Sequence, residues 1–266
     1  MKTAIITLSE KGSVLAEKLL QSMAEAELFV HKAVSVKGSA EKFDKVVELT
    51  ARIFDQYQGL IYIMPCGVVT RAISPCIKSK LTDPAVVVVD VGGRFAISLL
   101  SGHQGRANEL ALQIANIIDA EPVITTTTEA QKTIIVGIGC RKGANSADII
   151  EAINNAAGKA KVTIEQIRLL ASADIKKNEP GLLQASKQLG IPIRFITSDQ
   201  IRNTRRNFEC SQFVQQKVNL PAVAEPAALL AGIKTQIILP RTVYNHVTIA
   251  IARENCLSSG SGREDR

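Results

Sequence analysis

Three short apolar runs between residues 59 and 110 constrain the fold of this chain most strongly. They cover residues 60–64, 85–90 and 94–100, and each is followed by a loop of small, polar or charged residues. Short runs that are almost entirely apolar predict strands buried on both faces, as in an α/β sheet. Ligands of open α/β sheets bind at the carboxyl ends of the strands, so the loops after these runs are the first candidates for a functional site.

Strand patterns alternate with helix patterns throughout the first 130 residues. This order predicts a parallel sheet with right-handed crossovers. We therefore expect residues 1–130 to form an α/β domain with a Rossmann-like parallel sheet. Besides the three runs above, the patterns predict strands at residues 3–8, 28–36 and 121–125, and helices at residues 14–23, 43–54 and 107–118.

The second half of the chain repeats this alternation with a different sequence. The polar segment 129–132 marks the boundary, and residues 131–256 are expected to form a second α/β domain. Residues 257–266 contain too little apolar surface to fold, so we expect a disordered tail or a cloning remnant there. The patterns predict strands at residues 133–138, 167–171, 193–196, 235–239 and 246–252. They also predict a helix capped by Asn145 or Ser146, a helix at residues 181–189 that Gly190 ends, and a short helix that begins at Glu225.

The composition fits a cytoplasmic protein, and its scattered positive charge also suits a small polyanionic substrate. The formal net charge of +7 is spread along the chain, without the clustered patch typical of nucleic-acid binding, so we expect no nucleic-acid partner. Five cysteines without CxxC or zinc-ligand spacing predict neither a disulfide framework nor a structural zinc site, which fits a reducing cytosol. There is no signal-peptide pattern and no run of about 18 apolar residues, so we expect no membrane span.

A glycine-rich loop at residues 137–143 is similar to a phosphate loop but has a different spacing. It reads G-x-G-x-x-x-G, whereas the dinucleotide fingerprint needs G-x-G-x-x-G and an acidic residue about 20 positions later. The next predicted strand ends near Asp174, much too far along the chain. Two interpretations remain: a tight turn, or a loop that binds a substrate carboxylate through backbone N–H groups near Gly139 and the side chains of Arg141 and Lys142.

His103 is the strongest candidate for acid–base chemistry. It lies in a loop with Ser101, Gly102 and Gly105, and glycine lets a backbone approach a ligand closely. A structural histidine is the alternative. Metal ligation is disfavoured, because no partner His or Cys is nearby in the sequence. Asp90, at the end of the second apolar run, either orients His103 or faces solvent.

Charged residues occupy the first turn of the helix that follows this histidine. Arg106 and Asn108 lie there, and a cation at that position opposes the helix dipole. This placement favours an anionic partner for Arg106, and a solvated arginine is the alternative. Glu109 is favourable near a helix N-terminus for the dipole alone.

Further candidates follow other predicted strands, each with a structural alternative. Gly67 and Arg71 come just after the first apolar run. Thr125 and Thr126 either donate hydroxyl hydrogen bonds to an oxyanion or supply β-propensity. Glu225 either contacts a ligand or acts as an N-cap-like group before a proline.

Three segments of the first half resemble the N-terminal half of the cobalt-precorrin-5A hydrolases of anaerobic cobalamin biosynthesis (CbiG): GLIYIMPCGVVTRAISP, KLTDPAVVVVDVGGRFAISLLSGHQGRANELA and PVITTTTE. Three segments of the second half resemble that family's C-terminal domain, also found in CobE proteins: VGIGCRKG, ASADIKKNEPGLLQAS and AVAEPAALLAG. The resemblance covers roughly residues 1–253, and SGHQGRANEL is its most specific block. In this chain Gly105-Arg106 replaces the usual glycine pair of that block.

The resemblance implies a fold and a reaction. The C-terminal half would be a three-layer α/β domain of the CobE and CbiG type. The substrate would be cobalt-precorrin-5A, an acidic tetrapyrrole of vitamin B12 and corrinoid metabolism. The enzyme would be a hydrolase that opens a δ-lactone between the ring A acetate and carbon C20, then expels that carbon as acetaldehyde to give cobalt-precorrin-5B. The substrate carries the cobalt, so neither a cofactor nor a protein-bound metal is expected. A non-catalytic corrinoid carrier is the alternative, and a homodimer is left open.

The implied chemistry assigns roles to the candidate residues. The attacking water needs a general base, for which His103 is the first choice, followed by Glu109 and Asp90. The oxyanion needs hydrogen-bond donors, and the substrate's carboxylates need cations. We expect the polar loops 101–106 and 139–144 to contact one substrate. The expected substrate contacts are Gly67, Arg71, Ser101, Gly102, Gly105, Arg106, Asn108, Thr125, Thr126, Gly139, Arg141, Lys142 and Glu225.

Overall fold

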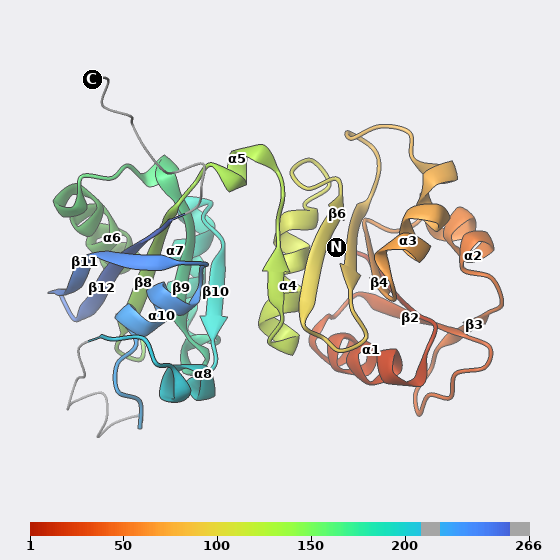
Figure 1. Ribbon diagram of the computed structural model, residues 1–266, viewed down its shortest axis with the longest axis horizontal. Coiled ribbons are helices and arrows are strands. Elements are labelled where there is room, and N and C mark those ends of the chain that lie inside the picture. Colours follow the sequence, from red (N-terminus) through yellow and green to blue (C-terminus); the bar gives the residue numbers. More distant parts are fainter. Residues whose placement is uncertain (209–218, 256–266) are drawn as a thin grey trace. The chain divides into compact units, whose positions relative to one another are not determined.

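The computed structural model describes residues 1–208 and 219–255 (Figure 1). The chain forms two compact units, Met1–Thr126 and a second that begins at Thr127. Each unit contains one sheet with helices on both faces, so the prediction of two α/β domains is confirmed. The tail 257–266, predicted to be disordered, lies outside the described residues. Within the described ranges, no helix is both long and apolar enough to cross a membrane.

The first unit contains a seven-stranded sheet. Its strands are β1 (Thr3–Thr7), β2 (Ala26–His31), β3 (Glu41–Phe43), β4 (Gly59–Ile63), β5 (Ala85–Val89), β6 (Phe95–Leu100) and β7 (Glu121–Val123). They lie in the order β3-β2-β1-β4-β5-β6-β7. Strands β1 to β5 run parallel, whereas β6 runs antiparallel to β5, and β7 runs parallel to β6.

The direction of β6 corrects the prediction of an all-parallel sheet. Only residues 90–94 join β5 to β6, and a crossover between parallel strands needs about a dozen residues or more. The Asp90 carboxylate closes this turn by accepting hydrogen bonds from the backbone N–H groups of Gly92, Arg94 and Phe95. As a consequence, the loop after β6 lies at the opposite edge of the sheet from the loops after β1, β4 and β5.

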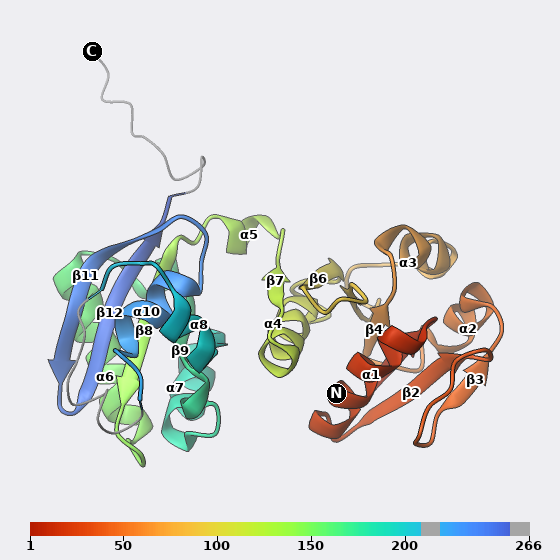
Figure 2. The ribbon, with the colours of Figure 1, turned by 60° about the horizontal axis from the view of Figure 1, so that its bottom comes forward.

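Helices cover both faces of this sheet (Figure 2). They are α1 (Glu10–Ser22), α2 (Val46–Ile53), α3 (Cys66–Ile73) and α4 (Ala107–Ile118). Side chains of the central strand β4 alternate between the faces. Ile61 and Ile63 pack with α1 and α4, whereas Leu60 and Tyr62 pack with α2 and α3.

Local patterns predicted some of these elements better than others. The helix predicted at 107–118 is confirmed with those bounds. The helix α3 was not predicted, because Pro65 and Gly67 suggested a loop, yet Pro65 is the residue before its first turn. Phe43, predicted to begin a helix, belongs to the short strand β3.

The second unit contains a five-stranded sheet. Its strands are β8 (Ile134–Cys140), β9 (Ile167–Ala173), β10 (Ile193–Ile196), β11 (Thr235–Tyr244) and β12 (Val247–Glu254), in the order β10-β9-β8-β12-β11. Strands β8, β9 and β10 run parallel. Strands β11 and β12 form an antiparallel hairpin that pairs with β8 through β12.

This sheet lies between two helical layers, which confirms a three-layer domain (Figure 1). The helices are α5 (Thr127–Ala130), α6 (Ser146–Ala160), α7 (Pro180–Leu189), α8 (Ser198–Asn203) and α10 (Ala224–Leu230). Side chains of α6 and α7 pack on one face, and those of α8 and α10 pack on the other. Two predicted helix ends are confirmed: the Asn145 side chain caps α6, and Gly190 ends α7 with a φ of +64°.

Candidate active site

Residues 101–106, which we call the histidine loop, connect β6 to α4. Both ends of the loop have left-handed backbone, with φ of +58° at Ser101 and +67° at Arg106. The backbone N–H groups of Ala107 and Asn108 donate to the carbonyl oxygens of Ser101 and Gly102 at 3.2 and 3.1 Å. The loop therefore curls onto the first turn of α4, and His103 lies exposed within it.

Two glycines of the histidine loop are required by close packing. A Cβ at Gly105 would lie 2.5 Å from Ser101 Cβ and 3.1 Å from the carbonyl oxygen of Asp83. A Cβ at Gly102 would lie 2.6 Å from Thr126 Cγ2. From the sequence, we expected these glycines to let a ligand come close to the backbone. In the structure, atoms of the protein itself occupy the space beside both glycines.

The Asn108 side chain joins the histidine loop to two other segments. Asn108 is only 7% exposed, its Oδ1 accepts a hydrogen bond from Ser98 Oγ at 2.8 Å, and its Nδ2 donates to Thr126 Oγ1 at 3.0 Å. Asn108 and Thr126 were both predicted to contact substrate, and the structure brings them together. Ser98 was not predicted, because one serine within an apolar strand has no local signal of function.

The hydroxyl of Ser101 stands out within this loop. Its Oγ is buried and makes no hydrogen bond with the described residues. Ser101 also adopts a backbone conformation that non-glycine residues seldom adopt. Unsatisfied buried groups and strained residues concentrate at functional sites, so Ser101 stays a candidate donor to a substrate oxygen.

Arg106 forms an ion pair with Glu109. The Nε and Nη2 atoms of Arg106 lie 2.9 and 2.5 Å from Oε2 of Glu109. Glu109 raises the pKa of Arg106 through this hydrogen bond and its charge. Because both side chains are exposed, the pair contributes little stability. A substrate carboxylate could therefore compete for Arg106.

Three predicted site residues lie at the other edge of the sheet. Gly67 and Arg71 belong to α3, where Arg71 Nη1 donates to the Gly67 carbonyl oxygen at 3.3 Å. Asp90 follows β5, and the five residues of that strand span about 17 Å at about 3.3 Å per residue. The expectation that Asp90 orients His103 is therefore wrong, because β6 runs back across the sheet before it reaches the histidine.

The carboxylate of Asp90 is instead committed to its own turn. Burial acts to raise its pKa, but hydrogen bonds from Phe95, Arg94 and Gly92 outweigh that effect and lower it. These bonds favour the charged form of the carboxylate. Asp90 is thus a structural group in the β5–β6 connection.

Residues 141–144, which we call the cation loop, follow β8 at the carboxyl edge of the second sheet. Gly143 has a φ of +78°, as a tight turn requires. Arg141 and Lys142 are exposed, and among the described residues no ion pair involves either of them. The two interpretations of this loop are compatible, because the tight turn presents two cations beside the start of α6.

The remaining predicted contacts are divided between surface and interior. Thr125 is exposed after β7, and Gly139 lies near the end of β8. Glu225 lies in the first turn of α10 with 4% exposure, and its Oε1 accepts a hydrogen bond from the Arg241 backbone N–H at 2.7 Å. Glu225 is therefore not the N-cap-like group of the structural alternative, because the N-cap of α10 is Val223 and the Glu225 carboxylate contacts β11 instead. A substrate contact of Glu225 stays a prediction.

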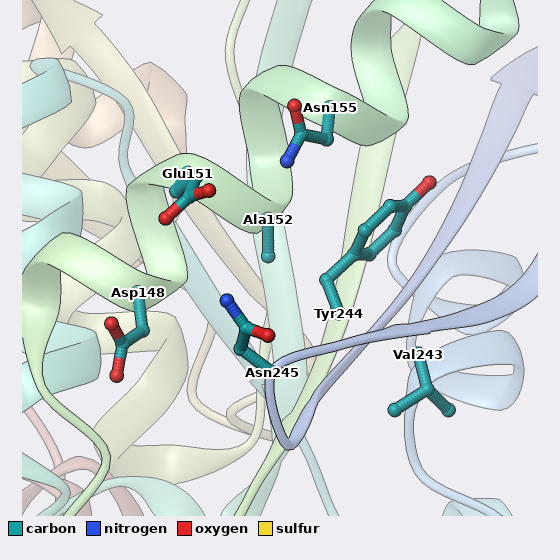
Figure 3. A pocket seen from close by; sticks show the side chains of 7 residues that line it. All are labelled: Asp148, Glu151, Ala152, Asn155, Val243, Tyr244 and Asn245. Carbon is teal, nitrogen blue, oxygen red and sulfur yellow. The ribbon is translucent and has the colours of Figure 1, made fainter.

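A pocket of about 360 Å³ lies between α6 and the β11–β12 hairpin (Figure 3). The carboxylates of Asp148 and Glu151 line it, together with the amides of Asn155 and Asn245. The Tyr244 hydroxyl is buried and has no hydrogen-bond partner within the described residues. None of the predicted site residues lines this pocket, and its negative charge is unsuited to a ligand rich in carboxylates.

Both halves of the chain match families of cobalamin synthesis proteins. Residues 48–129 match the family described as "Cobalamin synthesis G N-terminal", and residues 134–252 match "Cobalamin synthesis G C-terminus". The chain is 23% identical to the cobalt-precorrin-5A hydrolase of Priestia megaterium, with 94% of each protein covered. It is 25% identical to the enzyme of that name from Salmonella typhimurium, over 82% of this chain and 89% of that protein. It is 30% identical to protein CobE from Sinorhizobium, over 47% of this chain and 83% of that protein.

Proposed function

Because this chain belongs to the cobalamin synthesis G family, we propose that it is a cobalt-precorrin-5A hydrolase of anaerobic cobalamin biosynthesis. The observation that carries this proposal is the order and extent of the matches. Both family regions occur in sequence, and two hydrolases of that name align over most of their length and of this chain.

The proposed reaction has two bond-breaking steps. Water adds to the carbonyl carbon of the δ-lactone, and the acyl–oxygen bond breaks to leave the ring A carboxylate and an oxygen on C20. The hydroxyl on C20 then loses its proton to a base, and its oxygen becomes the carbonyl oxygen of acetaldehyde as the bond from C20 to the macrocycle breaks. The electron pair of that bond passes into the conjugated macrocycle. Cobalt is part of the substrate, so the proposal requires no protein-bound cofactor.

His103 is proposed as the base that takes a proton from the attacking water. Its exposure makes it accessible to a large substrate, and the neighbouring glycines pack too closely to be replaced without moving the loop. A base must lie within hydrogen-bond reach of the proton it removes, and a loop with a fixed backbone supports such positioning. Glu109 is the next candidate, although its present partner is Arg106.

Donors for the oxyanion are proposed from the same loop. The Ser101 hydroxyl is unsatisfied, and α4 directs its N-terminus toward the histidine loop. A helix N-terminus favours negative charge, and preorganised donors stabilise a tetrahedral intermediate. Arg141 and Lys142 of the cation loop are proposed to bind the substrate's peripheral carboxylates.

The proposal is tested by incubating the purified protein with cobalt-precorrin-5A and measuring acetaldehyde through NADH oxidation by alcohol dehydrogenase. We expect acetaldehyde in an amount equal to the corrinoid consumed. Tight corrinoid binding without acetaldehyde would indicate a carrier instead. A homodimer stays a prediction, which light scattering during gel filtration would check.

A further inference from the structure

Glu179, which is buried, and Lys176, which is partly buried, form an ion pair next to the cation loop. Lys176 Nζ lies 3.2 Å from Glu179 Oε2, and the two side chains are 14% and 6% exposed. The other carboxylate oxygen, Oε1, accepts a hydrogen bond from the backbone N–H of Gly143 at 2.7 Å. Glu179 thus connects a partly buried cation to the tip of a loop that is 36 residues away in sequence.

The start of α7 holds the cation loop at a second point. A Cβ at Gly181 would collide with the carbonyl oxygen of Ala144, so the first turn of α7 lies directly against the end of the loop. Glu179 comes immediately before α7, which begins at Pro180. The two contacts together fix the backbone on both sides of the left-handed turn at Gly143.

A buried ion pair is a weak source of stability, because both charges lose their hydration. In some proteins such pairs instead specify a particular geometry. Here the geometry is that of the cation loop, whose exposed Arg141 and Lys142 have no ion-pair partner among the described residues. The arrangement holds two cations in place at the carboxyl edge of β8, beside the N-terminus of α6, where an anion is favoured.

We propose that Glu179, held by Lys176, is a positioning residue that fixes the cation loop for the substrate's carboxylates. This inference rests on the proposed function. A preorganised loop binds more tightly, because less conformational freedom is lost when the ligand arrives. Peripheral carboxylates do not change charge during the reaction, so their binding is equal in the ground and transition states. Loss of Glu179 should therefore raise KM and leave kcat unchanged.

Three variants separate the parts of this arrangement. Glu179→Ala removes the hydrogen bond and the charge, Glu179→Gln keeps an acceptor for the Gly143 N–H but removes the charge, and Lys176→Met removes the cation. We expect Glu179→Ala to raise KM for cobalt-precorrin-5A about tenfold or more, with kcat within about twofold of the parent. Glu179→Gln and Lys176→Met should raise KM less. An unchanged KM in Glu179→Gln and Lys176→Met, whether or not Glu179→Ala folds, would overturn the proposal.

Glu254 provides a matched control in the same unit. Its side chain is similarly buried, its Oε1 accepts a hydrogen bond from the Ile233 backbone N–H at 2.7 Å, and its Oε2 lies 2.8 Å from Arg168 Nε. Glu254→Gln should lower the melting temperature about as much as Glu179→Gln does, without changing KM. An equal rise of KM in both variants would mean that general destabilisation is responsible, and would overturn the positioning role.

Two further measurements keep this inference separate from the proposed function. The dissociation constant of cobalt-precorrin-5A, measured from its absorbance change, should rise in Glu179→Ala even if the protein releases no acetaldehyde, in which case only the proposed function fails. In Arg141→Ala, adding Glu179→Ala should raise the dissociation constant much less than it does in the parent. If Glu179→Ala raised the dissociation constant by the same factor in Arg141→Ala as in the parent, Glu179 would not act through the cation loop.

Discussion

Asn108 Nδ2 donates a hydrogen bond to Thr126 Oγ1 across 3.0 Å, and so joins the first turn of α4 to the segment that follows β7. The other amide atom, Oδ1, accepts a hydrogen bond from Ser98 Oγ in β6. One side chain therefore holds together the strand before the histidine loop, the helix after it and the segment at Thr126. This arrangement makes the position of His103 depend on a buried amide that need not touch the substrate.

Replacement of Asn108 should destabilise the first unit. Asn108→Ala leaves the buried hydroxyl of Ser98 without its partner, and we expect the free energy of unfolding to fall by about 1–3 kcal/mol. Urea denaturation would measure the change. Gln113→Ala, on the exposed side of the same helix, is the control and should change stability by less than about 0.5 kcal/mol. Equal stability of the two variants would show that the hydrogen bonds of Asn108 do not stabilise the first unit.

The histidine loop should not accept a side chain at position 105. Gly105→Ala would place its Cβ against Ser101 and Asp83, so the loop must move, and both the melting temperature and the acetaldehyde rate should fall. Gly158→Ala in α6 is the matched control, because nothing lies within 4 Å of its Cβ. That variant should gain about 0.5–1 kcal/mol from helix propensity and keep its activity. A fully active Gly105→Ala protein would contradict the described packing.

His103→Asn should keep the fold but lose at least about a hundredfold in rate at pH 7, as expected when a general base is removed. His246→Asn is the control, since His246 is an exposed loop histidine with left-handed backbone that asparagine tolerates. A His103→Asn enzyme within about threefold of the parent rate would exclude His103 as the base, and Glu109 would be tested next.

Asp90→Asn should affect stability and not turnover. Hydrogen bonds in the folded protein lower the pKa of Asp90. The charged carboxylate therefore stabilises the fold fully at pH values above the unfolded-state pKa of about 3.9. This stabilisation is lost as the pH falls through the lower pKa of the folded state. The difference in unfolding free energy between parent and variant should therefore be largest near pH 7 and shrink below about pH 4. Urea denaturation across that pH range checks the trend. A large loss of kcat in Asp90→Asn would contradict the prediction and indicate that Asp90 takes part in catalysis.

Local sequence patterns were sufficient for elements that bury a regular apolar face. The helix at 107–118 and the strand at 193–196 have their predicted bounds for that reason. The direction of β6 was also accessible, because Gly92 and Gly93 lie in a connection too short for a crossover. The ion pair of Arg106 with Glu109 was less accessible, because Arg106 precedes the helix and has a left-handed backbone.

The contacts that position the residues of the candidate site could not be predicted from local sequence patterns. Ser98, Asn108 and Thr126 come from three separate segments, and Glu179 meets Gly143 only after two strands and a helix have packed together. A buried glutamate before a proline looks locally like any helix start. Long-range hydrogen bonds between polar side chains and backbone groups therefore had to come from the structure.

The central claim is that this protein catalyses addition of water to the lactone of cobalt-precorrin-5A. The most direct test is to run the reaction in water labelled with oxygen-18 and analyse both products by mass spectrometry. We predict that one labelled oxygen enters the ring A carboxylate of the corrinoid while acetaldehyde forms, and that His103→Asn shows neither within the same time. Acetaldehyde release that is equally fast without the protein, or a corrinoid product without the label, would contradict this account.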